Sequence, residues 1–118
     1  MAHSIRLREP WQCEPLGGEG RGGVKYSRRF HRPTGLEATS RVWLIIEEAT
    51  ADAVVALNGQ ELGKTQSNSY PARFEITARI EAQNFLEITV LSNEGPGSGL
   101  GLVRLEIEES TASCEVTG

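Results

Sequence analysis

The sequence of 118 residues has little of what holds a protein in a membrane or binds a metal ion. It contains no apolar run of about eighteen residues, so no segment is long enough to cross a bilayer as a helix. It has two histidines, His3 and His31, and neither stands in a zinc-binding motif such as H-E-x-x-H or C-x-x-C. We therefore expect no membrane partner, no metal and no cofactor.

Basic charge is also scarce, because 12 Lys and Arg residues face 16 Asp and Glu residues, for a net charge of −4. A surface that binds nucleic acid needs a basic stripe, and this average charge repels phosphate. Arg28, Arg29 and Arg32 are close in the sequence, but the alternation of a strand is expected to send Arg28 and Arg29 to opposite faces. The sequence predicts no nucleic-acid partner.

Targeting signals and disulfides are not expected either. The first nine residues lack the apolar stretch of a signal peptide. The chain as written is therefore predicted to be cytoplasmic, or else to be a processed form that has lost its targeting signal. Cys13 follows the first predicted strand and Cys114 follows the last. If these strands are antiparallel neighbours, the two cysteines lie ~24 Å apart, which is too far for a disulfide. Free thiols fit a reducing compartment.

Glycine, in contrast, is abundant: there are thirteen, and nine of them fall in the segments 17–23 and 95–101. Such clusters suit tight loops between short strands better than a helical bundle. Alternation of apolar and polar residues, or an apolar run of strand length, predicts strands in most of the remaining chain. The expected strands are 3–8, 24–31, 41–46, 52–57, 60–62, 74–77, 86–90 and 103–108.

The segment 47–57 is ambiguous, because its first half, rich in Glu and Ala, favours a helix by intrinsic propensity. Its second half alternates through Ala53, Val55 and Leu57, and Asn58-Gly59 is a strong hairpin-turn signal. We expect a strand, a tight turn and a return strand through Leu62. The prediction is an all-β protein: one antiparallel β-sandwich, a jelly roll, over residues 1–109, with 110–118 as a flexible tail.

Several motifs resemble the sugar-binding domain of family-two glycoside hydrolases. Residues 24–33, Val-Lys-Tyr-Ser-Arg-Arg-Phe-His-Arg-Pro, resemble the strand that opens this domain. Residues 56–63, Ala-Leu-Asn-Gly-Gln-Glu-Leu-Gly, are the most specific match, and 70–77 and 84–90 are similar to later strands. The resemblance covers about residues 10–107. It departs at 47–50, Glu-Glu-Ala-Thr, where the family has a glycine.

The resemblance implies a galactose-binding-like sandwich without catalysis, since the family's catalytic carboxylates lie in a separate barrel domain. The residues themselves also suggest no enzyme. Glu106 and Glu108 lie ~7 Å apart on one strand face, a spacing that a glycosidase could use. They also fit a solvated outer face opposite Val103, Leu105 and Ile107, and we prefer that interpretation. No serine stands in a G-x-S-x-G motif.

The candidate ligand site lies at one rim of the sandwich, where the glycine-bearing loops 9–23 and 92–101 are expected to meet. In some β-galactosidases of the family, a loop at this rim places a polar side chain at the sugar. Trp11 either stacks on a sugar or packs at the sandwich edge, and Gln12, Asn93 and Glu94 would bind hydroxyl groups. The glycines are either simple turn residues or part of a ligand loop. Gln66, Asn68 and Tyr70 form a second, weaker patch.

Two functions from different classes remain open at this point. The first is weak carbohydrate recognition at the rim, alone or beside a separately encoded glycosidase. The second is a protein-interaction or scaffolding sandwich that has lost the sugar. The second predicts an exposed apolar patch around Trp43 and Ile45, in a strand that is apolar on both faces.

Overall fold

A computed structural model of the chain describes residues 2–7, 11–15, 23–49, 52–66, 69–91 and 100–109, and the statements below concern these residues. They form nine strands. The strands are β1 (Ala2–Arg6), β2 (Gln12–Pro15), β3 (Val24–His31), β4 (Arg41–Ile46), β5 (Ala53–Leu57), β6 (Gln60–Thr65), β7 (Ala72–Glu75), β8 (Gln83–Val90) and β9 (Val103–Glu108). In this part of the chain, no helix is long and apolar enough to span a membrane.

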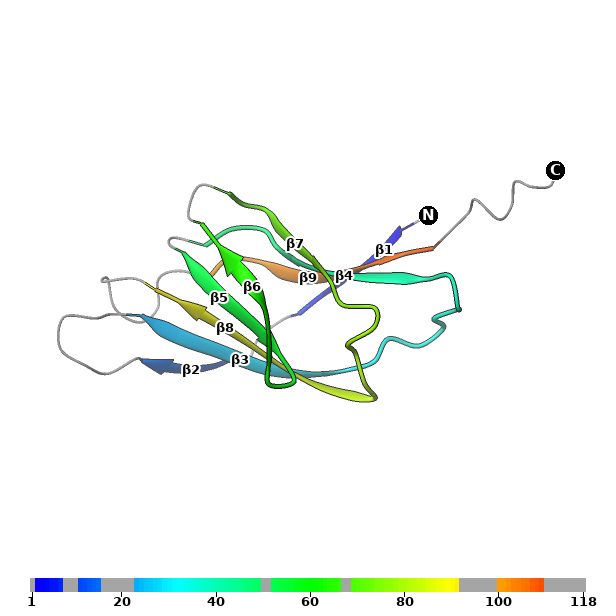
Figure 1. The fold of residues 1–118 in the computed structure, drawn as a ribbon, viewed down its shortest axis with the longest axis horizontal. Coiled ribbons are helices and arrows are strands. Elements are labelled where there is room, and N and C mark those ends of the chain that lie inside the picture. The colour runs from blue at the N-terminus through cyan, green and yellow to red at the C-terminus, as the bar shows by residue number, and fades with distance from the viewer. Residues whose placement is uncertain are drawn as a thin grey trace.

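The strands form two antiparallel sheets packed as the layers of a sandwich (Figure 1). One sheet has the order β1-β9-β4-β7 and the other the order β2-β3-β8-β5-β6. The first and last strands pair antiparallel, with Ile5 opposite Leu105, as the sequence predicted. The all-β jelly-roll prediction is confirmed.

The core lies between the two sheets and is built from the residues that alternate inward. In β8, Leu86, Ile88 and Val90 are at most 1% exposed, whereas Phe85, Glu87 and Thr89 between them are partly exposed. β4, β5 and β9 contribute further buried side chains: Val42, Leu44, Ile46, Val55, Leu57, Val103, Leu105 and Ile107. Burial of each large apolar side chain contributes about 2 kcal/mol, so this alternation determines which face of each strand turns inward.

The Asn58-Gly59 hairpin between β5 and β6 forms as predicted. Asn58 and Gly59 both have positive φ, at 53° and 84°, which is the geometry that a two-residue turn of this kind requires. The Asn58 side chain also forms hydrogen bonds outside the turn. Its Oδ1 accepts from the Phe85 amide at 2.7 Å, and its Nδ2 donates to Asn84 Oδ1 at 3.0 Å. The motif asparagine therefore ties the hairpin to β8.

Gly63, the last residue of the Ala56–Gly63 motif, lies against an aromatic ring. A Cβ atom at this position would lie 2.9 Å from Phe74 Cε1, which is closer than carbon atoms approach. The glycine thus lets β6 pass beneath Phe74 of β7, in the other sheet. The most specific motif of the sequence is explained here by a turn and by close packing.

Several elements differ from the sequence prediction. β1 covers Ala2–Arg6 instead of 3–8, and β8 begins at Gln83 instead of at residue 86. β2 was not expected, because Gln12, Cys13, Glu14 and Pro15 are all exposed and show no alternation. β6 continues to Thr65 instead of ending at Leu62, and β7 covers Ala72–Glu75 instead of 74–77. After Glu75 the chain turns, and the amide of Ile76 donates to the carbonyl of Val42 at 2.8 Å. Residues 110–118, the expected tail, lie outside the described residues.

One end of the sandwich collects the connections between strands. Across the five-stranded sheet, Pro15, Val24, Val90, Ala53 and Thr65 lie in one row. In the other sheet, Ile46 pairs with both Val103 and Ala72. These residues begin or end the connections β2–β3, β4–β5, β6–β7 and β8–β9, so all four leave from the same end, at the left of Figure 1. We call this end the rim.

Candidate functional site

Backbone hydrogen bonds hold the connections together at the rim. The Leu7 amide donates to the Val103 carbonyl at 2.9 Å, the Glu47 amide to the Leu102 carbonyl at 2.9 Å, and the Leu91 amide to the Asp52 carbonyl at 2.8 Å. Gly101 lies so close to Glu48 that a Cβ atom would be 2.8 Å from its Cγ. The described residues on either side of 92–99 are therefore fixed to the β4–β5 connection.

Tyr26 links the flanks of the two glycine-bearing loops. It faces Cys13 across the β2–β3 pair and is 7% exposed. Burial raises the pKa of its phenol, and the nearby Cys13 thiol raises it further, whereas a hydrogen bond with the Leu100 backbone lowers it. Tyr26 thus pairs with Cys13 of the segment 9–23 and forms a hydrogen bond with the backbone of Leu100 in the segment 92–101.

Trp11 lies partly buried just before β2. Its indole Nε1 donates to the Leu7 carbonyl at 3.3 Å, and its ring packs against the core. Because the indole N–H already donates to Leu7, a ligand could contact only the exposed part of the ring. The edge-packing interpretation accounts for the buried part of Trp11, and stacking on a sugar stays a prediction.

Gln12 is exposed in β2, opposite Ser27, and lies three residues along the strand from the row that marks the rim. The structure therefore places Gln12 beside β3 and not with the flanks of loop 92–101. The two remaining residues of this candidate site, Asn93 and Glu94, lie outside the described residues.

The second predicted patch lies at the rim as well, because the β6–β7 connection leaves there. Tyr70 is partly buried against the core, and its hydroxyl lies 2.6 Å from Thr65 Oγ1. Gln66 is exposed, and its carbonyl accepts from the Ser69 amide at 2.9 Å. Asn68 is outside the described residues. Sequence reasoning treated the two patches as separate, and the strand register brings their connections to one end.

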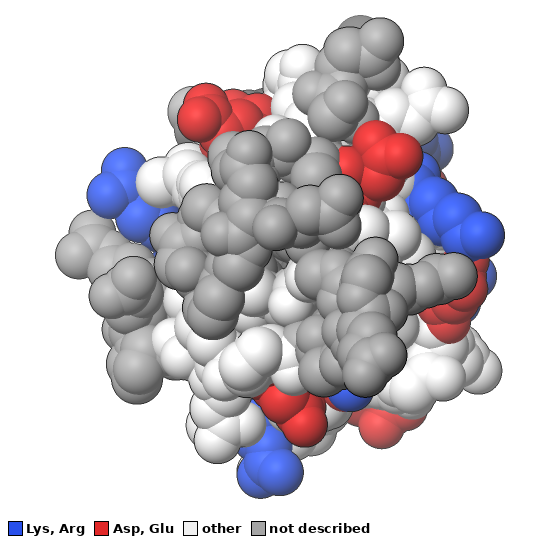
Figure 2. Space-filling view, turned by 90° about the vertical axis from the view of Figure 1, so that its left-hand side faces the viewer, with Lys and Arg blue, Asp and Glu red and all other residues white. Residues whose placement is uncertain are grey.

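Figure 2 looks onto this end of the molecule. Acidic and basic side chains of the described residues lie around its margin, and the visible ones do not gather into a patch of one sign.

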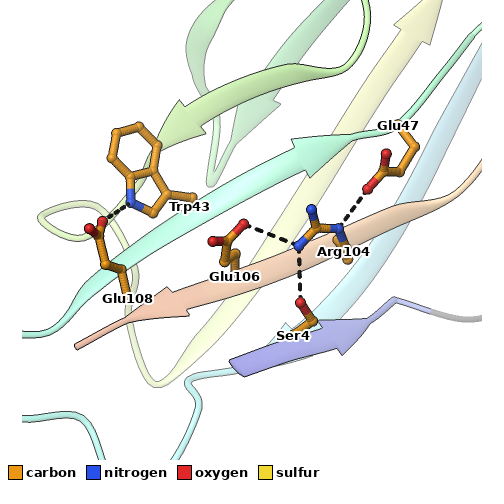
Figure 3. A network of polar contacts seen from close by, with 6 residues as sticks. All are labelled: Ser4, Trp43, Glu47, Arg104, Glu106 and Glu108. Carbon is orange, nitrogen blue, oxygen red and sulfur yellow. Dashed lines mark hydrogen bonds and ion pairs between the residues drawn. The ribbon is translucent and has the colours of Figure 1, made fainter. Parts of the chain in front are cut away.

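The two carboxylates considered for catalysis lie on the outer face of the four-stranded sheet (Figure 3). Glu108 Oε1 accepts from Trp43 Nε1 at 3.0 Å, and Glu106 Oε1 lies 3.2 Å from Arg104 Nη1. Arg104 also contacts Glu47 Oε2 at 2.6 Å and Ser4 Oγ at 3.0 Å. The hydrogen bonds to Glu47 and Glu106 raise the pKa of Arg104. Both carboxylates are therefore engaged by neighbouring side chains on a surface network.

The same face covers Ile45. This residue is 2% exposed and pairs with Arg104 on one side and Arg73 on the other. The Arg73 guanidinium lies 4.6 Å from the centre of the Trp43 ring. The side chains of this face thus form a charged surface above an apolar strand.

Neither histidine lies in a cluster that could bind a metal. His3 is exposed, with Nε2 3.8 Å from Glu109 Oε2, and His31 is exposed in β3. In the described part of the chain, no three His, Cys, Asp or Glu residues gather as metal ligands. Cys13 is an exposed free cysteine, and Cys114 lies outside the described residues.

The sandwich and its motifs correspond to a known family. A profile of the glycosyl hydrolase 2 galactose-binding domain-like family matches residues 20–97. The chain belongs to this family. The match includes β3 through β8 and the Asn58-Gly59 hairpin, so the resemblance inferred from the motifs is confirmed.

Solved structures contain the same fold within much longer enzymes. An FMN-binding β-glucuronidase from Facaelibacterium prausnitzii L2-6 is 23% identical, with a TM-score of 0.74, over 92% of this chain and 23% of the enzyme. The β-glucuronidase of Bifidobacterium dentium is 17% identical, with a TM-score of 0.74, over 92% of this chain and 30% of the enzyme. A rhamnosidase from Novosphingobium sp. PP1Y is 26% identical, with a TM-score of 0.60, over 74% of this chain and 11% of the enzyme.

This chain therefore spans less than a third of each of these enzymes. The domain that the family profile describes is the galactose-binding-like one, and the described residues form that sandwich alone. A comparison with curated proteins gives no match.

Proposed function

We propose that this galactose-binding-like domain is a non-catalytic carbohydrate-recognition module that binds glycans weakly at the rim. The observation that carries the proposal is the pairing of Val24 with Val90, which sets the end of loop 9–23 beside the start of loop 92–101 and supports a single surface there. Trp11 is the proposed stacking residue, and Asn93 and Glu94 are the proposed hydroxyl-binding residues. Gln12, which lies beside β3, is no longer part of this proposed site.

The β6–β7 connection extends this proposed surface. Gln66 and Tyr70 lie in the connection that starts at this end of the sandwich, so a longer glycan could reach them from the first patch. Asn68, which stands between them in the sequence, is proposed as part of the same patch. The similarity to two β-glucuronidases and a rhamnosidase supports a role beside a glycosidase, with this sandwich as the accessory domain and another domain as the catalyst.

The competing hypothesis, a protein-interaction sandwich, receives less support. It needs an apolar patch around Trp43 and Ile45, and Ile45 is 2% exposed while Arg73 lies over Trp43. A charged face of this kind resembles an ordinary solvated surface.

The test is a calorimetric titration of the chain with galactosides, glucuronides and plant oligosaccharides. We expect dissociation constants in the millimolar range, and we expect Trp11→Phe to weaken binding by about threefold to tenfold through the loss of indole stacking. Trp43→Phe is the matched control, because it makes the same change on the outer face of the other sheet. The absence of heat at millimolar concentrations of every glycan would refute the proposal.

A further inference from the structure

A second surface is formed where β2 leaves the edge of β3 uncovered. β2 pairs with Val24–Ser27 of β3, whereas β8 pairs with all of β3 up to His31. β2 begins at Gln12, opposite Ser27, so among the described strands β3 continues past it as an edge. A hollow of about 560 Å³ lies at this step, lined by Gln12, Ser27, Arg28, Arg29 and Phe85.

Two arginines line this hollow although strand alternation points their side chains to opposite faces. Arg28 occupies an inward position between the buried Tyr26 and Phe30. At an edge, a long side chain can leave the interior, and Arg28 Nη1 donates to the carbonyl of Arg29 at 3.3 Å. Arg29 is exposed on the outer face, with its guanidinium 5.7 Å from the centre of the Phe85 ring.

The charge of the hollow differs from that of the whole molecule. The chain carries −4 overall, yet the described residues that line this hollow include two arginines and no carboxylate. Glu87 pairs with Ser27 in the sheet, but its Oε2 lies 3.5 Å from Lys25 Nζ, in an ion pair of its own. Arg29 forms no ion pair within the part of the chain that the structure describes.

The side chains of the hollow suit one class of ligand. A guanidinium binds a carboxylate through two parallel hydrogen bonds. The Phe85 ring offers an apolar surface to a sugar face, and Gln12 and Ser27 offer an amide and a hydroxyl to sugar hydroxyl groups. We propose that this hollow binds the carboxylate of an acidic glycan, with Arg29 as the principal carboxylate ligand. The proposal rests on glycan recognition as the function of the domain.

The experiment compares two sugars that differ only at C6: methyl β-D-glucuronide, which carries a carboxylate, and methyl β-D-glucoside, which carries a hydroxymethyl group. Binding is followed by the backbone amide shifts of the chain in two-dimensional NMR spectra. We expect the glucuronide to bind about tenfold more tightly, with shifts at Ser27, Arg29 and Phe85, and this preference should shrink at high salt because screening weakens exposed charge pairs.

Variants separate the arginine from general charge. Arg29→Gln should abolish the preference for the glucuronide, and Arg29→Lys should restore part of it, because lysine keeps the charge without the planar fork. Arg41→Gln is the matched control, since Arg41 is an exposed arginine at the start of β4, in the other sheet, and this change should leave the preference intact.

Each outcome distinguishes this site from the proposed rim function. Equal binding of both sugars, with shifts at Gly23 and Gly101 and none at Arg29, would leave the rim function standing and overturn the acidic-glycan site. Glucuronide binding at Arg29 with no shifts at the rim would support the hollow and refute the rim. Binding of neither sugar would overturn both. Inorganic sulfate that binds Arg29 as tightly as the glucuronide would reduce the hollow to an adventitious ion site and also overturn the proposal.

Discussion

Asn84 is the side chain that organises the end of the sandwich opposite the rim. It is 2% exposed, and its amide bonds the backbone of Glu81 at 2.8 and 2.9 Å, the carbonyl of Phe30 at 3.3 Å and the side chain of Asn58 at 3.0 Å. A buried amide with every partner in place fixes one geometry, because any alternative leaves polar groups unpaired. The sequence contained Asn84 in a family motif, but it gave no sign that its role is structural.

Replacement of Asn84 by alanine should therefore be costly. We expect Asn84→Ala to lower the free energy of unfolding by about 3 kcal/mol, because the backbone groups of Glu81 and Phe30 lose buried partners. Urea unfolding measures this as a lower midpoint with an unchanged slope. Gln83→Ala, at the exposed neighbouring position, should change the stability by less than about 0.5 kcal/mol. An Asn84→Ala effect as small as that of Gln83→Ala would contradict the structural role.

At the scale of elements, alternation predicted the strands whose two faces differ. In β8 and β9, buried and partly exposed residues follow one another, so the sequence pattern is visible without any structure. β2 has no such pattern, since it is an edge strand whose four residues are all exposed. Its position in the sheet is determined by its pairing with β3, and the periodicity of the sequence does not predict this pairing.

Alternation predicted that Arg28 and Arg29 of β3 point to opposite faces, and the structure agrees, because Arg28 lies between the buried Tyr26 and Phe30 whereas Arg29 is exposed. The alternation did not show that both arginines line one hollow at the edge of the sheet, where Arg28 reaches the carbonyl of Arg29. The basic hollow beside β2 could be recognised once the missing strand was known.

The Arg104 network should stabilise the four-stranded sheet. Arg104 joins Ser4 of β1, Glu106 of β9 and Glu47 beyond β4, so one side chain connects three neighbouring segments. We expect Arg104→Leu to lower the free energy of unfolding by about 1 kcal/mol at low salt, because two carboxylates lose their partner on a half-exposed surface.

The salt dependence is the discriminating part of this prediction. In 1 M NaCl the loss should shrink, since screening there acts over ~3 Å. Arg41→Leu serves as the control, because Arg41 forms no ion pair in the described residues of the same sheet. If Arg104→Leu lowers the free energy of unfolding equally at both salt concentrations, then Arg104 stabilises the sheet through packing and not through charge.

At the scale of the molecule, the fold and the family were predictable and the site only in outline. The motifs around Asn58-Gly59 and the alternating strands define a galactose-binding-like sandwich, and the family match over residues 20–97 agrees. The register then gathers four strand connections at the rim, including that of Gln66 and Tyr70, and places Gln12 beside β3 instead. Register depends on pairing between distant strands, and for that reason the sequence could not separate the rim from the hollow.

Two tryptophans make the central claim, glycan recognition at the rim, directly measurable. Trp11 is connected to the rim through Leu7, because its indole bonds the Leu7 carbonyl and the Leu7 amide bonds Val103. Trp43 lies on the outer face of the four-stranded sheet, so the two indole N–H signals form a reporter and an internal reference in one NMR spectrum. Addition of neutral galactosides or plant oligosaccharides at millimolar concentrations should shift the Trp11 signal and leave the Trp43 signal in place. If the Trp11 signal stays fixed with every glycan, or if Trp43 shifts in its place, recognition at the rim is contradicted.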